Sequence, residues 1–356
     1  MSKKLKIGLI GAGAIAQALH MPAYAHFADM CEMVAVCDIN EDVAKTQADK
    51  YGIKKVMTDY KDLLAIKEID AVSVTTPNAV HMQPTIDALN AGKHVLCEKP
   101  LAMNAEEARK MCNAAKDNKK ILMVALPNRF NGPGVFLKKY IDDGKMGDIY
   151  YARAWALRRR GVPHWGVFIN KELQGGGPLI DIGVHILDLT LFLMGYPKPV
   201  CASGKTWDML GKNPGLTNPW GEYDRSKFTV EDFAVGLIKF DNGAVVTLES
   251  SFMANIDGDP FTTTLLGTKS GATITPWGSE KVKIFTESDK QIFDLIPRNI
   301  PDYNGGQREV EAFMKAILEG KPSPVPGEHG LILNAIFDAL YKSSETGKEE
   351  TVDVSF

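Results

Sequence analysis

Cysteine is scarce in this chain, and its spacing excludes several kinds of site. The 356 residues include five cysteines, and no two of them form a CxxC pair or another spacing typical of metal ligands. An odd number of scattered cysteines is typical of reduced thiols rather than of a disulfide framework. We therefore expect a cytoplasmic protein without a metal site. The five residues are Cys31, Cys37, Cys97, Cys112 and Cys201.

Long apolar runs and an excess of one charge are also missing. No uncharged apolar stretch reaches the roughly 18 residues that a membrane-spanning helix needs, and the best candidate, residues 179–194, contains two aspartates and a histidine. The 41 lysine and arginine residues nearly balance the 44 aspartate and glutamate residues, so the formal net charge is -3. A chain without a basic field is a poor partner for nucleic acid. We expect neither a membrane nor a nucleic acid as partner.

The length of the chain exceeds the size at which one hydrophobic core usually stops growing, so we expect two domains. In residues 1–125, short apolar runs alternate with helix-like stretches, which is the pattern of a parallel sheet covered by helices on both faces. This predicts an N-terminal Rossmann domain with a doubly wound parallel sheet. The expected strands are residues 6–10, 33–37, 71–75, 94–97 and 121–125, and the expected helices are residues 14–27, 42–51, 80–91 and 105–118.

The pattern changes from residue 126 onward. Two long alternating segments, 228–240 and 244–252, are joined by Asp241-Asn242-Gly243, and an Asn-Gly turn between alternating runs predicts a β-hairpin. Residues 126–356 are therefore expected to form a C-terminal α+β domain with a large, mainly antiparallel open sheet. Further strands are expected at 149–157, 262–266, 273–275 and 281–285, and helices at 307–319 and 329–344.

A glycine-rich motif lies between the first expected strand and the first expected helix. It reads G-x-G-x-x-A, where the first glycine permits a tight turn, the second lets the backbone approach a pyrophosphate, and the alanine allows close packing of helix and strand. The free N–H groups at the start of the helix favour an anion. The motif predicts a dinucleotide site formed by Gly11, Gly13, Ala14, Ile15 and Ala16.

Asp38 supports the dinucleotide site because it ends the second expected strand, 22 residues after Ala16. An acid about 20 residues beyond the motif accepts hydrogen bonds from the ribose hydroxyls of NAD. The carboxylate would repel a 2′-phosphate, and the following residues 39–42 contain no lysine or arginine. NAD is therefore expected in preference to NADP. The alternative, Asp38 as a cap for the helix that follows, is less favoured by this position.

Two more motifs follow expected strands at the edge where ligands bind in such sheets. Thr76-Pro77-Asn78 with His81 comes after residues 71–75, and His81 either approaches the cofactor or caps the next helix. Glu98-Lys99-Pro100 comes directly after residues 94–97. A lysine there can point over the nicotinamide, although a lone lysine at a strand end is usually a solvated charge. We expect Thr76, Pro77, Asn78, His81, Glu98 and Lys99 to contact the cofactor.

A third motif begins with Gly175-Gly176-Gly177-Pro178 and continues through Asp181, His185 and Asp188. If the segment is one helix, Asp181 and His185 stand four residues apart on one face. A carboxylate beside a histidine can fix its tautomer, and a histidine suits the base that removes a hydroxyl proton while hydride leaves carbon. The glycines would let the backbone pack close to a ligand. A buried helix whose histidine only satisfies a neighbour remains the alternative.

Taken together, these motifs resemble the Gfo/Idh/MocA family of oxidoreductases, and the resemblance spans essentially the whole chain. It implies a Rossmann domain, a C-terminal domain whose open sheet often forms oligomer contacts, and a catalytic set that maps onto Lys99, Asp181 and His185. By this resemblance His185 is the acid/base, Asp181 orients it and Lys99 hydrogen-bonds the reacting oxygen. Some members give proton transfer to the lysine or a tyrosine. A homo-oligomer, dimer or tetramer, is implied.

The substrate side is less defined. Arg158 and Trp165 belong to Arg158-Arg159-Arg160-Gly161-Val162-Pro163-His164-Trp165, where they could bind polyol oxygens or stack on a sugar ring. The alternative is a solvated basic loop with a packed tryptophan. Asn128 and Arg129 follow residues 121–125 and could reach either ligand. His164 is a rival base, and Trp207, Trp220 and Tyr223 could line a sugar site or only pack.

These observations favour an NAD-dependent dehydrogenase that moves a hydride to or from a secondary carbinol of a sugar, glycoside or cyclic polyol. The hypothesis requires Lys99 and His185 to reach the same nicotinamide. Two alternatives remain: an enzyme that retains NAD and uses transient sugar oxidation for glycosidic cleavage or sugar–sugar redox exchange, and a non-catalytic NAD or sugar sensor.

Overall fold

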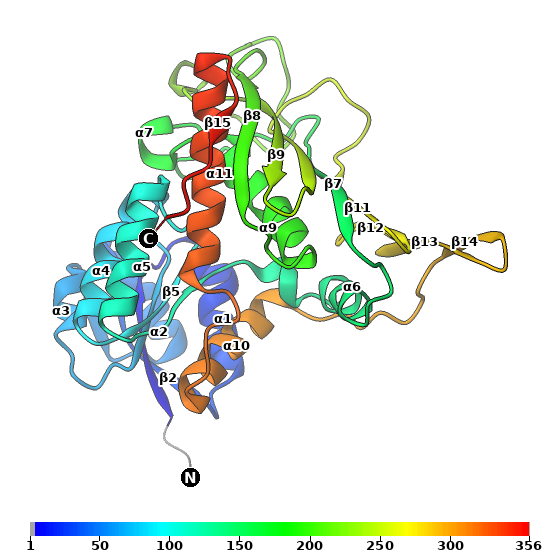
Figure 1. Cartoon of the computed structure of the whole chain (residues 1–356). Helices are drawn as coiled ribbons and strands as arrows, with labels where there is room; N and C mark the ends of the chain where they lie inside the picture. The colour runs from blue at the N-terminus through cyan, green and yellow to red at the C-terminus, as the bar shows by residue number, and fades with distance from the viewer. Residues whose placement is uncertain (1–3, 356) are drawn as a thin grey trace. The chain divides into compact units, whose positions relative to one another are not determined.

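The computed structural model describes residues 4–355, and its chain forms two compact units (Figure 1). The first unit contains the residues up to Pro127 together with Asn304–Leu331, and the second contains Asn128–Tyr303 and Ile332–Ser355. A single cut near residue 125 therefore does not separate them, because the chain returns to the first unit before it ends. Residues 1–3 and 356 of the two expected domains lie outside the described part.

The first unit is built on a six-stranded sheet of order β3-β2-β1-β4-β5-β6, in which every neighbouring pair is parallel. The four-residue strands β4 and β5 are almost wholly buried, which is typical of a sheet with helices on both faces. The predicted doubly wound Rossmann sheet is confirmed. The strands are β1 (Leu5–Ile10), β2 (Cys31–Cys37), β3 (Lys55–Met57), β4 (Ala71–Val74), β5 (His94–Cys97) and β6 (Leu122–Val124).

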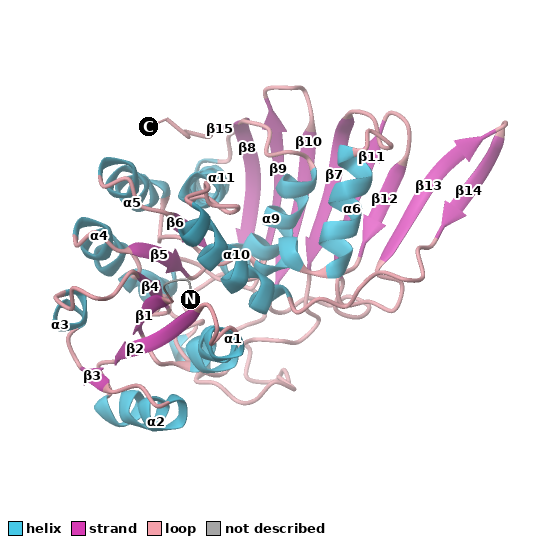
Figure 2. Ribbon diagram, turned by 90° about the horizontal axis from the view of Figure 1, so that it is seen from below, coloured by secondary structure: helices cyan, strands magenta, loops and turns pink. Residues whose placement is uncertain are grey.

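Helices flank this sheet (Figure 2). The first one departs from the expected regular helix, because a π-helical turn, η1 (Ala16–His20), precedes α1 (Met21–His26). Pro22 explains the change, since its ring crowds the preceding turn and it has no N–H to donate there. The others are α2 (Glu41–Tyr51), α3 (Tyr60–Leu64), η2 (Asn78–Val80), α4 (Met82–Asn90), α5 (Ala105–Asp117) and α10 (Gly305–Glu319).

The second unit is built on a nine-stranded sheet of order β14-β13-β12-β11-β7-β10-β9-β8-β15 (Figure 2). Only β7 and β10 pair in parallel, so the predicted, mainly antiparallel sheet is confirmed. The predicted hairpin joins β9 to β10 through Gly243. The strands are β7 (Ile149–Ala156), β8 (Pro199–Trp207), β9 (Phe233–Phe240), β10 (Val245–Ser251), β11 (Phe261–Gly267), β12 (Gly271–Ile274), β13 (Val282–Ser288), β14 (Gln291–Leu295) and β15 (Glu350–Thr351).

Helices pack against the middle of this sheet. The apolar helix α9 (Gly183–Leu193) contacts β7, β10 and β11. The long helix α11 (Gly327–Thr346) lies close to β8 and β9, because Gly204 and Gly236 leave room for Leu340: an added Cβ would lie 2.8 Å and 2.6 Å from its Cδ2. The remaining helices are η3 (Pro127–Phe130), α6 (Gly132–Asp142), α7 (Lys171–Gln174), α8 (Pro178–Asp181) and η4 (Arg225–Lys227).

No single helix in residues 4–355 is long and apolar enough to cross a membrane. One pair, Lys171–Asp181 with Gly183–Leu193, reaches that length and composition together but is bent by 46°. Most side chains of α9 are buried within the second unit.

Candidate active site

The glycine-rich turn of the first unit has the geometry of a phosphate cradle. Gly11 has a φ of +96°, and an added Cβ would lie 2.8 Å from the main-chain oxygen of Thr75, so no larger residue fits there. At Gly13 an added Cβ would meet nothing within 4 Å. Gly13 thus borders open space, where the backbone can approach a ligand.

The helix after this turn can hold an anion. Helical structure begins at Ala14, and the N–H groups of a first turn have no partner within their own helix. Ala14 and Ile15 are exposed, whereas Ala16 is fully buried against the sheet. These are the properties that a dinucleotide pyrophosphate requires. The residues present therefore fit NAD.

Asp38 follows β2 and faces this turn. Its Oδ2 accepts a hydrogen bond from the N–H of Ala12 at 2.8 Å, and its Oδ1 accepts one from Asn40 at 2.9 Å. The side chain is half-buried, and its remaining lone pairs can accept from ribose hydroxyls. The helix α2 is capped by Asn40, which accepts from the N–H groups of Asp42 and Val43, so Asp38 is not its cap.

Thr75 was not foreseen as part of the site, although it holds the glycine turn in place. Its hydroxyl donates to the main-chain oxygen of Gly11 at 2.9 Å and joins the end of β4 to the end of β1. The next residues, Thr76 and Pro77, are partly or largely accessible, and Asn78 is buried. A small buried hydroxyl at a strand end carries no motif of its own, so only the contact reveals it.

His81 is fully buried, and both of its ring nitrogens face main-chain oxygens. Nδ1 lies 2.9 Å from the oxygen of Pro100, and Nε2 lies 2.8 Å from the oxygen of Thr76. Burial lowers the pKa of His81, which favours the neutral imidazole. The side chain makes no capping hydrogen bond to α4. His81 therefore joins the Thr76 turn to the Pro100 turn and does not cap the next helix, while its contact with the cofactor stays a prediction.

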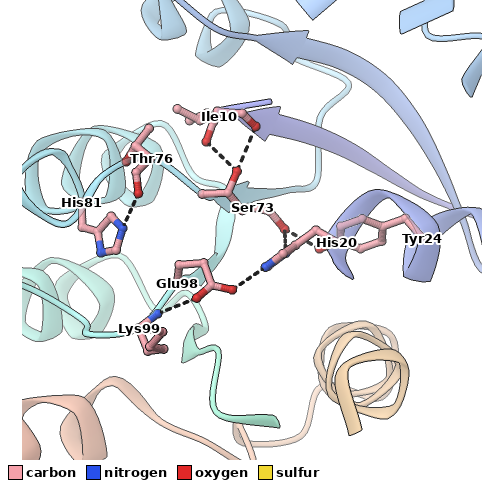
Figure 3. A network of polar contacts seen from close by, with 10 residues as sticks. Ile10, His20, Tyr24, Ser73, Thr76, His81, Glu98 and Lys99 are labelled. Carbon is pink, nitrogen blue, oxygen red and sulfur yellow. Dashed lines mark hydrogen bonds and ion pairs between the residues drawn. The ribbon is translucent and has the colours of Figure 1, made fainter. Parts of the chain in front are cut away.

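Glu98 and Lys99 lie at the carboxyl end of β5, as the sequence predicts (Figure 3). Lys99 is half-buried, and its main-chain N–H donates to Glu98 Oε2 at 3.0 Å. Burial by itself raises the pKa of Glu98, but the hydrogen bond from His20 and the charges of His20 and Lys99 bring the pKa below its usual value. Glu98 is therefore an ionised carboxylate at the base of the Lys99 turn.

In the second unit, Asp181 and His185 do not share one continuous helix. Asp181 is the last residue of α8, His185 lies in the first turn of α9, and the chain breaks at Ile182 between them. The Pro178 oxygen accepts both from Ile182 N–H and from the hydroxyl of Ser250 on β10. This hydroxyl approaches closely because Gly183 carries no side chain. Asp181 is buried and His185 is half-buried.

The glycine run before α8 packs against protein groups. An added Cβ at Gly176 would lie 1.9 Å from the Tyr341 hydroxyl, and one at Gly177 would lie 2.2 Å from the main-chain oxygen of Glu231. The Glu231 carboxylate accepts from the N–H groups of Gly177 and Leu179 and from Tyr341. Burial raises the pKa of Glu231. Its hydrogen bonds fix the start of the helix that carries Asp181, a function that the sequence did not reveal.

Asp188 and Arg129 form a buried ion pair. Both Nε and Nη2 of Arg129 donate to the Asp188 carboxylate, and the Tyr196 hydroxyl donates to the same group at 2.5 Å. Arg129 also stacks over the rings of Phe192 and Tyr196. This pair joins η3 to α9, and the neighbouring Asn128 is buried as well.

Arg158 lies between two aromatic rings on the loop after β7. Its guanidinium is 4.3 Å from the ring centre of Trp220 and 5.5 Å from that of Phe252. Burial lowers the pKa of Arg158, and the nearby charges of Asp181 and Asp259 partly oppose that shift. The structure thus brings Arg158 into the electrostatic neighbourhood of Asp181.

Trp165 and Trp220 form an accessible aromatic platform in the second unit. Their rings are stacked with centres 6.0 Å apart and 6° between the planes, and they are 45% and 40% exposed. Asn218 joins the two loops, because its amide accepts from Val162 N–H and donates to the oxygens of Val162 and Gly221. Trp165 is also in edge contact with His164, which is exposed.

The first unit thus has the fold and the loop chemistry of a dinucleotide-binding domain, and a lysine at the carboxyl end of β5 fits an oxidoreductase. Comparison with known proteins agrees. Residues 5–126 match the oxidoreductase family model for an NAD-binding Rossmann fold, and residues 138–354 match the model for the C-terminal alpha/beta domain of the same family. The chain belongs to the Gfo/Idh/MocA oxidoreductase family.

Individual relatives cover nearly the whole chain. A D-glucoside 3-dehydrogenase of Escherichia coli strain K12 is 40% identical over 97% of this chain and 97% of its own length. A levoglucosan dehydrogenase of Pseudarthrobacter phenanthrenivorans is 29% identical over 99% of this chain and 98% of its own. A solved structure of levoglucosan dehydrogenase with NADH and levoglucosan has a TM-score of 0.86, 26% identity, and coverage of 98% and 100%. The predicted class, an NAD-dependent oxidoreductase acting on CH–OH groups, is confirmed.

Proposed function

We propose that this enzyme oxidises a secondary ring hydroxyl of a D-glucoside to a ketone and reduces NAD. The observation that carries the proposal is the 40% identity to a D-glucoside 3-dehydrogenase along 97% of both chains. The motifs at Lys99, Asp181 and His185 supply the groups that this reaction needs. Hydride leaves the carbinol carbon and the hydroxyl proton leaves oxygen, so a hydride acceptor and a base are both required.

NAD supplies the nicotinamide ring that accepts the hydride. The N–H groups of the turn at Gly11 and Gly13 and of Ala14, Ile15 and Ala16 would bind its pyrophosphate. Asp38 would accept hydrogen bonds from the adenosine ribose, and its charge disfavours a 2′-phosphate, which supports a preference for NAD over NADP. Toward the nicotinamide end of NAD, the candidates for cofactor contacts are residues 76–78, Glu98 and Asn128. The side chain of Asn128 is buried.

We assign the proton to His185. Asp181 would orient its imidazole and stabilise the imidazolium form, and Lys99 would donate a hydrogen bond to the reacting oxygen. A rigid support favours this assignment, because Glu231 holds the start of α8 and Ser250 of β10 donates to the Pro178 oxygen of the same helix. The half-buried environment of His185 leaves the ring partly accessible to substrate.

Arg158 and Trp165 are the proposed substrate-binding residues outside the catalytic set. Arg158 would donate to sugar oxygens from its position near Asp181, and Trp165, with Trp220, would stack on an apolar sugar face. We also propose that the enzyme is a cytoplasmic homo-oligomer. All five cysteines are free thiols, which suits a reducing compartment.

Replacing His185 tests the mechanism. We expect His185→Ala to lower turnover at least about 100-fold, because general acid–base catalysis is typically worth that much. Binding of NADH should stay within about threefold, because the nucleotide residues are unchanged. The measurement is NADH formation with methyl glucosides, other aldoses and inositols, together with NADH titration by fluorescence. His164→Ala is the matched control, since His164 is an exposed histidine on the substrate side.

Two results would contradict the proposal. Near-normal turnover of His185→Ala would remove His185 from the mechanism. Product formation from a glucoside without net NADH would mean that the cofactor is retained and reoxidised within each turnover.

A further inference from the structure

A buried chain of polar groups connects the nucleotide-binding helix to the Lys99 turn (Figure 3). His20, on η1, is fully buried, and its Nε2 lies 2.9 Å from Glu98 Oε1. Its Nδ1 lies 3.2 Å from the hydroxyl of Ser73 on β4, and that hydroxyl lies 2.8 Å from the hydroxyl of Tyr24 on α1. The chain thus runs from Tyr24 through Ser73 and His20 to the carboxylate of Glu98, and it joins η1 and α1 to the ends of β4 and β5.

The direction of the hydrogen bonds follows from the chemistry of the groups. The Glu98 carboxylate only accepts, so Nε2 of His20 must carry a proton. On its other side, Nδ1 of His20 hydrogen-bonds the Ser73 hydroxyl, and that hydroxyl hydrogen-bonds the Tyr24 hydroxyl. His20 is the last residue of the π-helical turn η1, and its side chain is fully buried.

The arrangement of Ser73, His20 and Glu98 is not that of a nucleophile and its base. Ser73 is 0% exposed, and Tyr24 covers its other side. No substrate carbon can reach the hydroxyl. The chain therefore holds Glu98 in place rather than performing chemistry.

Glu98 transmits this position to Lys99. Its second oxygen, Oε2, accepts the main-chain N–H of Lys99 at 3.0 Å, so both carboxylate oxygens are in use, one toward His20 and one toward Lys99. Without His20, a buried carboxylate would lose a charge-stabilising donor and would be free to rotate. The Lys99 backbone would then lose its fixed acceptor.

We propose that His20 is a positioning residue for Lys99, acting through the carboxylate of Glu98. The proposal rests on the proposed function, in which Lys99 contacts the reacting oxygen. It also makes one helix serve two purposes: its N-terminus would hold the dinucleotide, and His20, at the end of the π turn and seven residues beyond Gly13, positions the reacting lysine.

The test compares His20→Leu with His20→Gln. Leucine fills the space without a donor, whereas the glutamine amide can still donate to Glu98. We expect His20→Leu to lower kcat about tenfold, in the range of supporting residues around reactive groups, with KM and NADH affinity within about threefold. His20→Gln should recover most of the loss. His26→Leu, the same change at an exposed histidine of α1, should leave kcat unchanged.

Two readouts separate positioning from a general structural role. In the protein without cofactor, the Lys99 amide should exchange its hydrogen faster in His20→Leu than in His20→Gln or His26→Leu. The acid limb of kcat should also move to higher pH in His20→Leu. Glu98 is protonated more easily in that variant, because its pKa is no longer lowered by His20 and, of the charges around it, only that of Lys99 still lowers it. His81, which also lies near Glu98, is neutral.

A double-mutant cycle of His20→Leu and Lys99→Met distinguishes a failure of the proposed function from a failure of the positioning role. If Lys99→Met retains full activity, the role of Lys99 in the proposed function is wrong. If Lys99→Met is impaired but His20→Leu has a normal kcat and normal Lys99 exchange, the positioning role alone is wrong. The positioning role requires that His20→Leu cause no further loss of kcat in a protein that already carries Lys99→Met. Should His20→Leu fail to fold, His20→Gln and His20→Asn take its place in the same cycle, because the shorter asparagine amide cannot reach Glu98 as the imidazole does.

Discussion

At the scale of single residues, Asp38 shows how one side chain can have two functions. It holds the glycine turn through the N–H of Ala12 and offers its charge to the ribose site. We predict that Asp38→Asn lowers kcat/KM with NAD about tenfold. The ratio of kcat/KM with NADP to kcat/KM with NAD should rise, because the repulsion of a 2′-phosphate disappears. Measuring kcat/KM with both cofactors checks this.

Asp42→Asn is the matched control for Asp38, since it removes the same charge from the exposed first turn of α2. Its ratio of NAD to NADP activity should equal that of the parent enzyme. An unchanged ratio in Asp38→Asn would show that another residue sets the cofactor preference.

His94 predicts a dependence of stability on pH. Burial, aided by the charge of Lys120, lowers the pKa of His94 from 6.5 to about 4, and its Nδ1 accepts the N–H of Ile121 at 3.1 Å. The unfolded chain therefore binds a proton at a higher pH than the folded chain. The contribution of His94 is fully present above about pH 6.5 and is lost as the pH falls toward 4, on the order of 1–3 kcal/mol.

The measurement is the free energy of unfolding of the parent protein and of His94→Asn between pH 7 and pH 4. Asparagine keeps an acceptor but does not titrate, so the parent should lose more stability than the variant over this range. His26→Asn, at an exposed position, should follow the parent curve. Parallel curves for the parent and His94→Asn would contradict the assignment.

At the scale of elements, the buried pair of Arg129 and Asp188 ties η3 to α9. Removing one partner leaves an uncompensated buried charge, which typically costs about 3–5 kcal/mol. We predict losses of that size for Arg129→Met and for Asp188→Leu, and a smaller loss for the double variant. Denaturant unfolding measures all three, and a double variant that is as unstable as the sum of the two would show that the groups do not interact.

The local sequence predicted the strands whose apolar runs are short and continuous, such as β4 and β5, and the Asn-Gly hairpin of β9 and β10. It did not predict β8 or β14. Strand β8 mixes small and polar residues, and Gly204 within it is explained by contacts with distant residues, the Leu340 side chain and the main-chain oxygen of Val235. Every residue of β14 is exposed, so no alternation marks it.

The same limit applies to the site. Asp38, Lys99, Asp181 and His185 stand in motifs whose spacing can be recognised, whereas His20, Thr75 and Glu231 act through partners that are distant in sequence. The expected single helix from Asp181 to His185 breaks at Ile182, and Ser250, on another element, donates to the Pro178 oxygen just before this break. Contacts between distant segments decide such details, and no local pattern encodes them.

At the scale of the whole molecule, each of the two units is built from two separate segments of the chain. Helix α10 follows the second unit in sequence, yet it packs on the first, where Gly306 lies so close to Leu19 that an added Cβ would be 2.6 Å from its Cδ1. Periodicity identifies such a helix but cannot say which core receives its apolar face.

One edge of the nine-stranded sheet, strand β14, carries exposed apolar side chains. In β14, Ile292 is 85% exposed, and Phe293 and Leu295, which point to one face, are 43% and 45% exposed. An exposed edge strand with several large apolar side chains is normally covered by a partner.

We therefore predict that copies of this chain associate through β14 and that Phe293→Lys/Leu295→Lys shifts the protein to a smaller species. Light scattering after size-exclusion chromatography measures the mass. Met209→Lys, at an exposed residue of the loop between β8 and η4, should leave the mass unchanged. A parent protein that is monomeric at micromolar concentration, or a double variant of unchanged mass, would exclude this strand as the interface.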